Sequence, residues 1–311
     1  MIIVASNKEA APKCIKSGLP ACAFYLFILQ TRLKNMNYRL LRIAAPLFLS
    51  ALIWVGNFAL LPTAKAQLTP NWWNSLDDDW KKLFKERHKI SANPTAAELT
   101  KIYNLDKLDC SESGIRNLEP LRNLTNLKVV WIDKNPSVVS LEPLRSLTKL
   151  TEIDFSGTGV SDLEPLRGLV NLTRLECFET NISSLAALSG LRKLKILDFS
   201  KTKVNSLFPL KNVLTLEVLY FSQTPVTDLS PLKALANLTE LNFSETKVAS
   251  IDALTAKGKL REIVFARTKV ASLAPLFNNR ALTIVFCEET GVSKADADAL
   301  QKKIPTCVVM M

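Results

Sequence analysis

The sequence predicts an α/β solenoid, with a parallel β-sheet on its concave face, tight helical turns on its convex side and a helical N-terminal cap. The first observation is a unit of 22 residues that recurs nine times, with one extra residue in the second copy. The second is an alternation of apolar side chains at the start of each unit, and the third is a proline further along most units. The units begin at Leu105, Leu127, Leu150, Leu172, Leu194, Leu216, Leu238, Leu260 and Leu282.

Each unit reads L-x-x-L-x-F-S-x-T-x-V-x-x-L-x-P-L-x-x-L-x-x. The segment L-x-x-L-x-F ends in an alternation with a period of two, which is typical of a short strand with one buried face. Positions 4 and 6 are then expected to point inward, and positions 3, 5 and 7 outward. Because one unit cannot bury its own leucines, neighbouring units must stack, with their strands paired in parallel about 4.8 Å apart.

Two turn signals follow the strand. Threonine occupies position 9 of seven units, where its hydroxyl can bond backbone groups of a turn. Proline near position 16 presets φ for a tight helical turn on the opposite side of the solenoid. These prolines are Pro120, Pro143, Pro165, Pro209, Pro231 and Pro275.

The repeat unit resembles a leucine-rich repeat, and its L-x-x-L-x-F-S-x-T form followed by D-L-x-P-L is most similar to the bacterial internalin-type subclass. The resemblance covers residues 105 to about 309. It implies a solenoid that presents its binding surface on the concave sheet, but it does not indicate which ligand is bound. One departure concerns position 9, where only Asn135 keeps the asparagine that is usual in the family.

A solenoid exposes its core at both ends and needs caps. Residues 67–104 are expected to form a helical cap, with capping boxes at Ser75–Asp78 and Thr95–Glu98 and with tryptophans that cover the first repeat. Repeats occupy residues 105–303. A last helix is expected over 294–303, with a capping box at Ser293–Asp296. A capping strand is expected over 304–311.

The N-terminus predicts export. Residues 36–66 have the three-part layout of a signal peptide: a basic stretch, an apolar run over 43–61 and an A-x-A site before Gln67. Residues 1–35 are interpreted as an upstream extension from a misassigned start. The alternative is that residues 36–66 remain as an uncleaved membrane anchor. Much of the net charge of +11 lies here, because the first 66 residues hold eight bases and one acid, so the charge is weak evidence for nucleic-acid binding.

Four cysteines follow the leader. An even number in an exported protein suggests disulfides. However, Cys110, Cys177 and Cys287 all fall at inward position 6, and the first two are three units apart, beyond disulfide reach. Buried free thiols are therefore the preferred interpretation. The N-x-[S/T] motifs at Asn123, Asn171, Asn181 and Asn237 largely follow from the repeat consensus and do not predict glycosylation.

The outward positions 3, 5 and 7 are acidic and aromatic. Acids outnumber bases there by nine to two, although the whole chain is basic. Aromatic side chains beside charges are typical of contact surfaces. The predicted ligand-binding residues are Trp131, Asp154, Glu176, Phe178, Asp198, Tyr220, Glu240 and Phe286. The alternative is a passive surface, in which carboxylates aid solubility and aromatics stabilise the strands.

These observations favour a non-catalytic interaction module that binds a basic or mixed-charge protein or peptide. A surface or periplasmic glycan-binding protein is the alternative. An enzyme is disfavoured because the chain has one histidine, His88, and its nine glycines form no nucleotide-binding loop. No cofactor, metal or nucleic acid is expected. Calcium binding by the acids lacks a loop motif.

Overall fold

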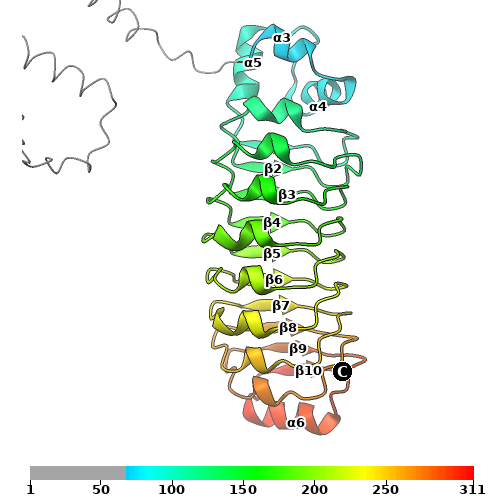
Figure 1. Cartoon of the computed structure of the whole chain (residues 1–311), viewed down its shortest axis with the longest axis vertical. Helices are drawn as coiled ribbons and strands as arrows, with labels where there is room; N and C mark the ends of the chain where they lie inside the picture. The colour runs from blue at the N-terminus through cyan, green and yellow to red at the C-terminus, as the bar shows by residue number, and fades with distance from the viewer. Residues whose placement is uncertain (1–67) are drawn as a thin grey trace, which may run out of the picture. The chain divides into compact units, whose positions relative to one another are not determined.

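The computed structural model describes residues 68–311, so the predicted extension at 1–35 and the predicted signal peptide at 36–66 lie outside the described residues. The described part is a solenoid with ten parallel strands in chain order in one open sheet (Figure 1). Each strand has three residues. In β1 to β9 these are positions 3 to 5 of a repeat unit, whereas β10 follows the ninth unit and pairs Val308 with Ile284. The strands are β1 (Lys107–Asp109), β2 (Val129–Trp131), β3 (Glu152–Asp154), β4 (Arg174–Glu176), β5 (Ile196–Asp198), β6 (Val218–Tyr220), β7 (Glu240–Asn242), β8 (Glu262–Val264), β9 (Ile284–Phe286) and β10 (Val308–Met310).

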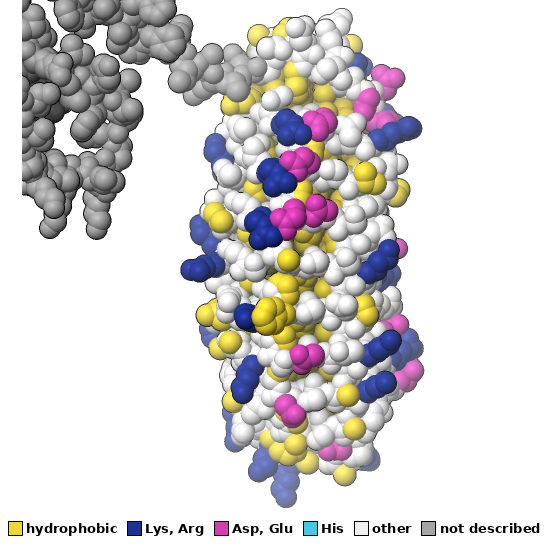
Figure 2. Space-filling model, in the orientation of Figure 1, with side chains coloured by type: hydrophobic (Ala, Val, Ile, Leu, Met, Phe, Trp, Pro, Cys, Tyr) yellow, Lys and Arg dark blue, Asp and Glu magenta, His cyan; other side chains and the backbone are white. Residues whose placement is uncertain are grey.

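The opposite side of each of the first eight repeats carries a 3₁₀ turn, and six of these eight turns have proline in their first two positions. The sequence therefore predicted this side correctly, as turns of the tightest helical type. The turns are η1 (Glu119–Asn123), η2 (Glu142–Leu144), η3 (Glu164–Leu166), η4 (Ala186–Gly190), η5 (Phe208–Leu210), η6 (Ser230–Ala234), η7 (Asp252–Leu254) and η8 (Ala274–Leu276). Figure 2 shows basic and acidic side chains side by side on the cap-side part of this face. Each of the first three turns carries an Arg–Glu ion pair between residues three apart in sequence.

A stack of phenylalanine rings runs through the core at position 6. Phe199, Phe221, Phe243 and Phe265 are all fully buried, and successive ring centroids lie 5.4–5.8 Å apart at interplanar angles of 9–16°. Cys110, Cys177 and Cys287 take the same position in other repeats. All three are buried and free, as is Cys307, in agreement with the core-thiol interpretation.

The chain leaves each strand through a left-handed residue at position 8. Nine consecutive units place φ between 52° and 66° at this position, and most of these residues are charged rather than glycine. That conformation is unfavourable for a residue with a Cβ atom. Two hydrogen bonds offset the strain. The position 8 N–H donates to the position 7 carbonyl of the next repeat, as in Lys201 N–H to Ser222 O at 2.8 Å, and the position 9 threonine hydroxyl donates to the position 6 carbonyl of its own repeat.

The threonine ladder therefore closes the turn in the way that the sequence suggested. Thr158, Thr180, Thr202, Thr224, Thr246, Thr268 and Thr290 all make this bond, at 2.6–2.8 Å. Asn135 instead bonds three carbonyls through Nδ2 and accepts the N–H of Ile115 at 3.1 Å, so one amide joins two repeats.

The N-terminal cap consists of α3 (Pro70–Asn74), α4 (Asp78–His88) and α5 (Ala96–Tyr103). The predicted box at Thr95–Glu98 is confirmed. The box predicted at Ser75–Asp78 is wrong, because Ser75 is the C-cap of the separate helix α3, and Asp77 caps α4 by accepting the Trp80 N–H at 3.0 Å.

Tryptophans join this cap to the first repeat. Trp80 is fully buried and its indole N–H donates to Asn117 O at 3.0 Å, while Trp73 packs its ring against Phe84. Both tryptophans are buried, as the sequence predicted, in one apolar cluster with Leu108 and Leu118 of the first repeat. At the other end, α6 (Lys294–Lys303) begins with the predicted box at Ser293 and Asp296, and β10 completes the sheet with a strand shorter than expected.

A candidate binding face on the parallel sheet

The outward residues of the strands form one continuous surface, which we call the sheet face. The last residue of each strand, at position 5 of the repeat unit in β1 to β9, pairs with the last residue of the next strand, so these side chains lie in a single row. Along this row the charge is concentrated toward the cap, because β1 to β5 contribute all four of its carboxylates and β6 to β10 contribute none. In order, the row is Asp109, Trp131, Asp154, Glu176, Asp198, Tyr220, Asn242, Val264, Phe286 and Met310.

The structure brings five of the eight predicted site residues together on adjacent strands, from Trp131 on β2 to Tyr220 on β6. Glu240 lies beside them as the first residue of β7, at position 3 of its repeat unit. Phe178 lies at position 7 after β4, and Phe286 stands apart on β9. All eight are partly exposed.

Trp131 is held on two sides by charged neighbours. The ammonium of Lys107 lies 3.4 Å from the centroid of the indole ring, which is a cation–π contact. The indole N–H donates to Glu152 Oε1 at 2.8 Å, across the strand boundary between β2 and β3. The ring therefore has a defined orientation before any partner arrives.

The other large aromatic of the row is held in the same way. The Tyr220 hydroxyl donates to a carboxylate oxygen of Glu240 on the next strand. That bond, together with burial as the larger cause, raises the pKa of the tyrosine above its ordinary value. On β4, the Arg174 Nε donates to Glu176 Oε1 at 2.7 Å, so this ion pair fixes a further residue of the row.

Two aspartates of the row are partly buried and are oriented by backbone hydrogen bonds. Asp154 Oδ1 accepts the Ser156 N–H at 2.9 Å, and Asp198 Oδ1 accepts the Ser200 N–H at 2.8 Å. Burial raises the pKa of both carboxyl groups above the ordinary value, although these hydrogen bonds act in the opposite direction. A cation that approached either carboxylate would offset this loss of hydration.

A hollow of about 230 Å³ opens on the sheet face over β2, β3 and β4. It has one aromatic wall, four carboxylates and one guanidinium, so its charge is predominantly negative. The residues around it are Trp131, Asp133, Glu152, Ile153, Asp154, Arg174 and Glu176.

Sequence reasoning missed the way in which the cap reaches this face. Arg87 at the end of α4 forms an ion pair with Asp109 at 2.8 Å and donates to the backbone carbonyls of Asp109 and Ser111. Asp109 is therefore a structural contact of the cap rather than a free acid. No signal in the repeat pattern could have shown this, because Arg87 lies outside the repeats.

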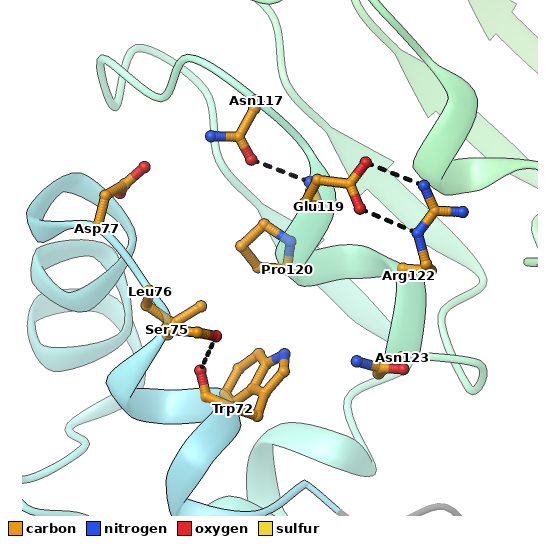
Figure 3. Close-up of a pocket in the computed structure, with 9 residues that line it drawn as sticks. All are labelled: Trp72, Ser75, Leu76, Asp77, Asn117, Glu119, Pro120, Arg122 and Asn123. Atoms are coloured by element: carbon orange, nitrogen blue, oxygen red, sulfur yellow. Dashed lines mark hydrogen bonds and ion pairs between the residues drawn. The ribbon is translucent and has the colours of Figure 1, made fainter.

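A second cleft, of about 410 Å³, lies where the cap meets the first 3₁₀ turn (Figure 3). Trp72 and Ser75 form one side of it, and Asn117, Glu119 and Arg122 form the other. Glu119 and Arg122 bond each other through two contacts of 2.9 and 3.0 Å. The cleft is on the turn side of the solenoid and does not contribute to the sheet face.

Other chemistry in the described residues is sparse. Within residues 68–311 there is no group of three or more His, Cys, Asp or Glu side chains arranged to hold a metal ion. Over the same range, no helix has the length and apolar character to cross a bilayer. Burial is the main cause of a lowered pKa for His88 in the cap. The centroid of its ring lies 5.9 Å from that of the Phe84 ring.

Comparisons with known proteins agree with this architecture. The family model described as "Leucine Rich repeats (2 copies)" matches residues 215–256. Among solved structures, internalin C2 of Listeria monocytogenes is similar at 27% identity with a TM-score of 0.66, over 71% of this chain and 98% of that one. No curated protein matches the chain in sequence.

Two more distant structures share the fold. The functional domain of InlJ from Listeria monocytogenes, which includes a cysteine ladder, aligns at 23% identity and a TM-score of 0.57, over 65% of this chain and 43% of that one. A leucine-rich repeat protein of Leptospira interrogans aligns at 17% identity and a TM-score of 0.59, over 70% and 63%. The repeat pattern, the ten-stranded parallel sheet and these likenesses together identify the chain as a leucine-rich repeat protein whose architecture is similar to that of the bacterial internalins.

Proposed function

We propose that this protein is a non-catalytic, exported interaction module that binds a protein partner of basic or mixed charge on its sheet face. The observation that carries the proposal is the row from Trp131 to Tyr220, in which partly exposed aromatics and carboxylates share five adjacent strands. A repeat scaffold holds such a row rigidly, because each strand is fixed by its two neighbours.

The two aromatics supply the anchoring energy. Large rigid side chains lose little conformational entropy on binding and are frequent among the residues that dominate interface energies. Trp131 and Tyr220 are already oriented by Glu152 and Glu240, so less ordering is needed when a partner docks. The surrounding carboxylates steer the encounter with a basic partner and raise the association rate at low salt.

A catalytic role finds little support in this geometry. Acid–base chemistry works best where water is excluded and where two groups have pKa values suited to their tasks. Asp154 and Glu176 lie on an open strand face, and the histidine of the chain lies in the cap, on α4. We therefore assign these carboxylates to binding rather than to a reaction.

Glycan binding is the second candidate. Trp131, Phe178 and Tyr220 are on the sheet face, where rings can stack on a sugar, and the neighbouring carboxylates can accept its hydroxyls. An array that carries both peptides and glycans separates the two candidates. The protein proposal expects captured peptides to be rich in Lys or Arg, and the signal to fall with salt. Capture of neutral glycans, insensitive to salt, would instead support the glycan-binding protein.

The array must include matched variants. Trp131→Ala combined with Tyr220→Ala should abolish most of the signal, whereas Lys211→Ala, on the turn side next to η5, should leave it unchanged. If the sheet-face variant retained full binding while the turn-side variant lost it, the proposed face would be wrong.

Export itself is tested at the N-terminus. The signal-peptide layout of residues 36–66 supports cleavage after Ala66, so N-terminal sequencing of the exported protein should read from Gln67. Recovery of the uncut chain in the membrane fraction would favour the anchor instead.

A further inference from the structure

We propose that the hollow over β2, β3 and β4 is a socket for one cationic side chain of the partner, in which a guanidinium lies against Trp131 and pairs with Asp154 and Glu176. This inference rests on the proposed function and makes it more specific. The partner presents one cationic side chain, and that side chain binds in the half of the sheet face that lies nearer the N-terminal cap.

The first argument is the composition of the hollow. Four carboxylates surround it, while its single base, Arg174, is already paired with Glu176. Glu152 is partly used by the indole N–H of Trp131. Asp133 and Asp154 have no basic partner among the residues that line the hollow. The electrostatic potential in the hollow is therefore negative and attracts a cation.

The second argument is independent of the carboxylates. Lys107 on β1 already places its ammonium 3.4 Å from the centre of the Trp131 ring. This contact shows that the ring attracts a cation in its own surroundings. Lys107 lies on β1, on the cap side of β2, whereas the hollow extends from Trp131 on β2 away from the cap, over β3 and β4. A second cation can therefore approach from the side that Lys107 does not occupy.

The third argument concerns the hydration of Asp154, which lines the hollow. This side chain is only partly exposed, and burial raises the pKa of its carboxyl group, so its charged form is incompletely hydrated in the free protein. A bound guanidinium replaces part of the lost hydration with charged hydrogen bonds.

Geometry favours arginine over lysine as the occupant. Asp154 and Glu176 occupy the same position on adjacent parallel strands, which are about 4.8 Å apart. A planar guanidinium presents several N–H donors in one plane and also stacks on aromatic rings, so it can bond both carboxylates while lying against the indole. An ammonium is a compact point charge and meets these groups less completely.

The test uses Nα-acetyl-arginine amide as the probe, with the neutral isostere Nα-acetyl-citrulline amide as its control. Binding to the full chain is followed through the indole N–H resonance of Trp131, which is assigned by its absence in Trp131→Phe. We expect a saturable shift with the arginine probe, little shift with the citrulline probe and an intermediate response with Nα-acetyl-lysine amide. Equal shifts with the arginine and citrulline probes, or no shift at this resonance, would overturn the proposal.

Variants locate the effect. Asp154→Asn with Glu176→Gln keeps the shape of both side chains and should weaken the arginine probe about tenfold. Glu262→Gln on β8 is the matched control, because it removes a partly exposed acid of the same face outside the hollow, and it should leave the affinity within about twofold. Equal losses in the two variants would show a diffuse charge effect and contradict the socket.

The failure of this inference can be told apart from the failure of the proposed function. If the probe does not bind but partner binding still depends on Tyr220 and Phe286, the sheet face stands and the socket falls. If partner binding is insensitive to every sheet-face substitution, both fall.

Discussion

The phenylalanine stack allows a stability prediction that compares two chemically identical substitutions. Phe221 is fully buried between Phe199 and Phe243, with ring centroids 5.6 and 5.8 Å away. Phe155 is equally buried at the same repeat position, but its register neighbours there are Ile132 and Cys177. Replacing either ring by leucine removes a similar amount of buried surface, so the difference between the two isolates the ring–ring interactions.

The magnitude follows from the two ring pairs in which Phe221 takes part. An aromatic pair contributes about 0.5–1.5 kcal/mol beyond its buried area. Phe221→Leu breaks both pairs and should therefore destabilise the protein by about 1–3 kcal/mol more than Phe155→Leu. Urea unfolding followed by circular dichroism measures both, and an unchanged dependence on urea concentration checks that the two variants unfold over the same surface.

Equal losses of stability in the two variants would refute this reasoning. They would mean that the stack contributes through burial alone. Because the stability of a solenoid depends on each repeat and on its interfaces, hydrogen exchange in the repeats on either side of Phe221 provides a second, local measurement.

Three further predictions concern the core, the turn and the cap. Leu163→Ala should cost about 2–5 kcal/mol in denaturant melts because this buried side chain leaves a cavity, whereas Asp154→Ala on the sheet face should stay within about 0.5 kcal/mol; the reverse order would show that the inward and outward positions are misassigned. Thr202→Val should cost about 1–3 kcal/mol because the buried carbonyl of Phe199 loses its donor, and Thr202→Ser should recover most of this loss, so failure of the serine to recover it would argue against the hydrogen bond. The backbone N–H groups of Thr95 and Ser91 lower the pKa of Glu98 from 4.5 to about 2, so its contribution to stability is present above pH 4.5 and is lost as the pH falls toward 2. Glu98→Gln should be less stable at neutral pH and lose less between pH 4.5 and 2, which melts across that range would show, and a loss equal to that of the wild type would contradict the assignment.

Much of the fold could be predicted from the sequence because the repeat imposes it. The period of two places Leu197 inward and Asp198 outward, and the 22-residue spacing stacks these positions in register. The same arithmetic identified the row of site residues, since any residue at position 5 must lie beside its counterpart in the next unit. Thr95 and Ser293 were predictable because capping boxes are local in sequence.

Interactions that depend on rotamers or on non-repeating segments could not be predicted. The bond from Tyr220 to Glu240 joins two repeats through side chains whose directions the pattern does not specify. The Arg87 clamp on Asp109 comes from a helix outside the repeat array. The helix boundary at Ser75 was misjudged because Ser75 and Asp77 are both good N-cap residues, and tertiary packing of the tryptophans decides between them.

Position 8 illustrates a different limit. Glutamate, lysine, glutamine and arginine all adopt a left-handed conformation there, although glycine is the residue that normally indicates one. The ladder of inter-repeat hydrogen bonds imposes this conformation, so the signal is the repeat itself rather than the residue type. Ser156 is a further exception, because its outward position predicted exposure and it is 1% exposed in the structure.

The central claim is that the sheet face, and not the turn side or the cap, is the surface by which this protein recognises its partner. The most direct measurement is quantitative capture from the native host with three matched baits: the wild-type protein, Trp131→Ala with Tyr220→Ala, and Lys211→Ala. A partner retained by the first and third baits and lost from the second, with an association rate that falls as salt rises, is the predicted result. A partner retained by the sheet-face variant and lost from Lys211→Ala would contradict the account and place recognition on the turn side.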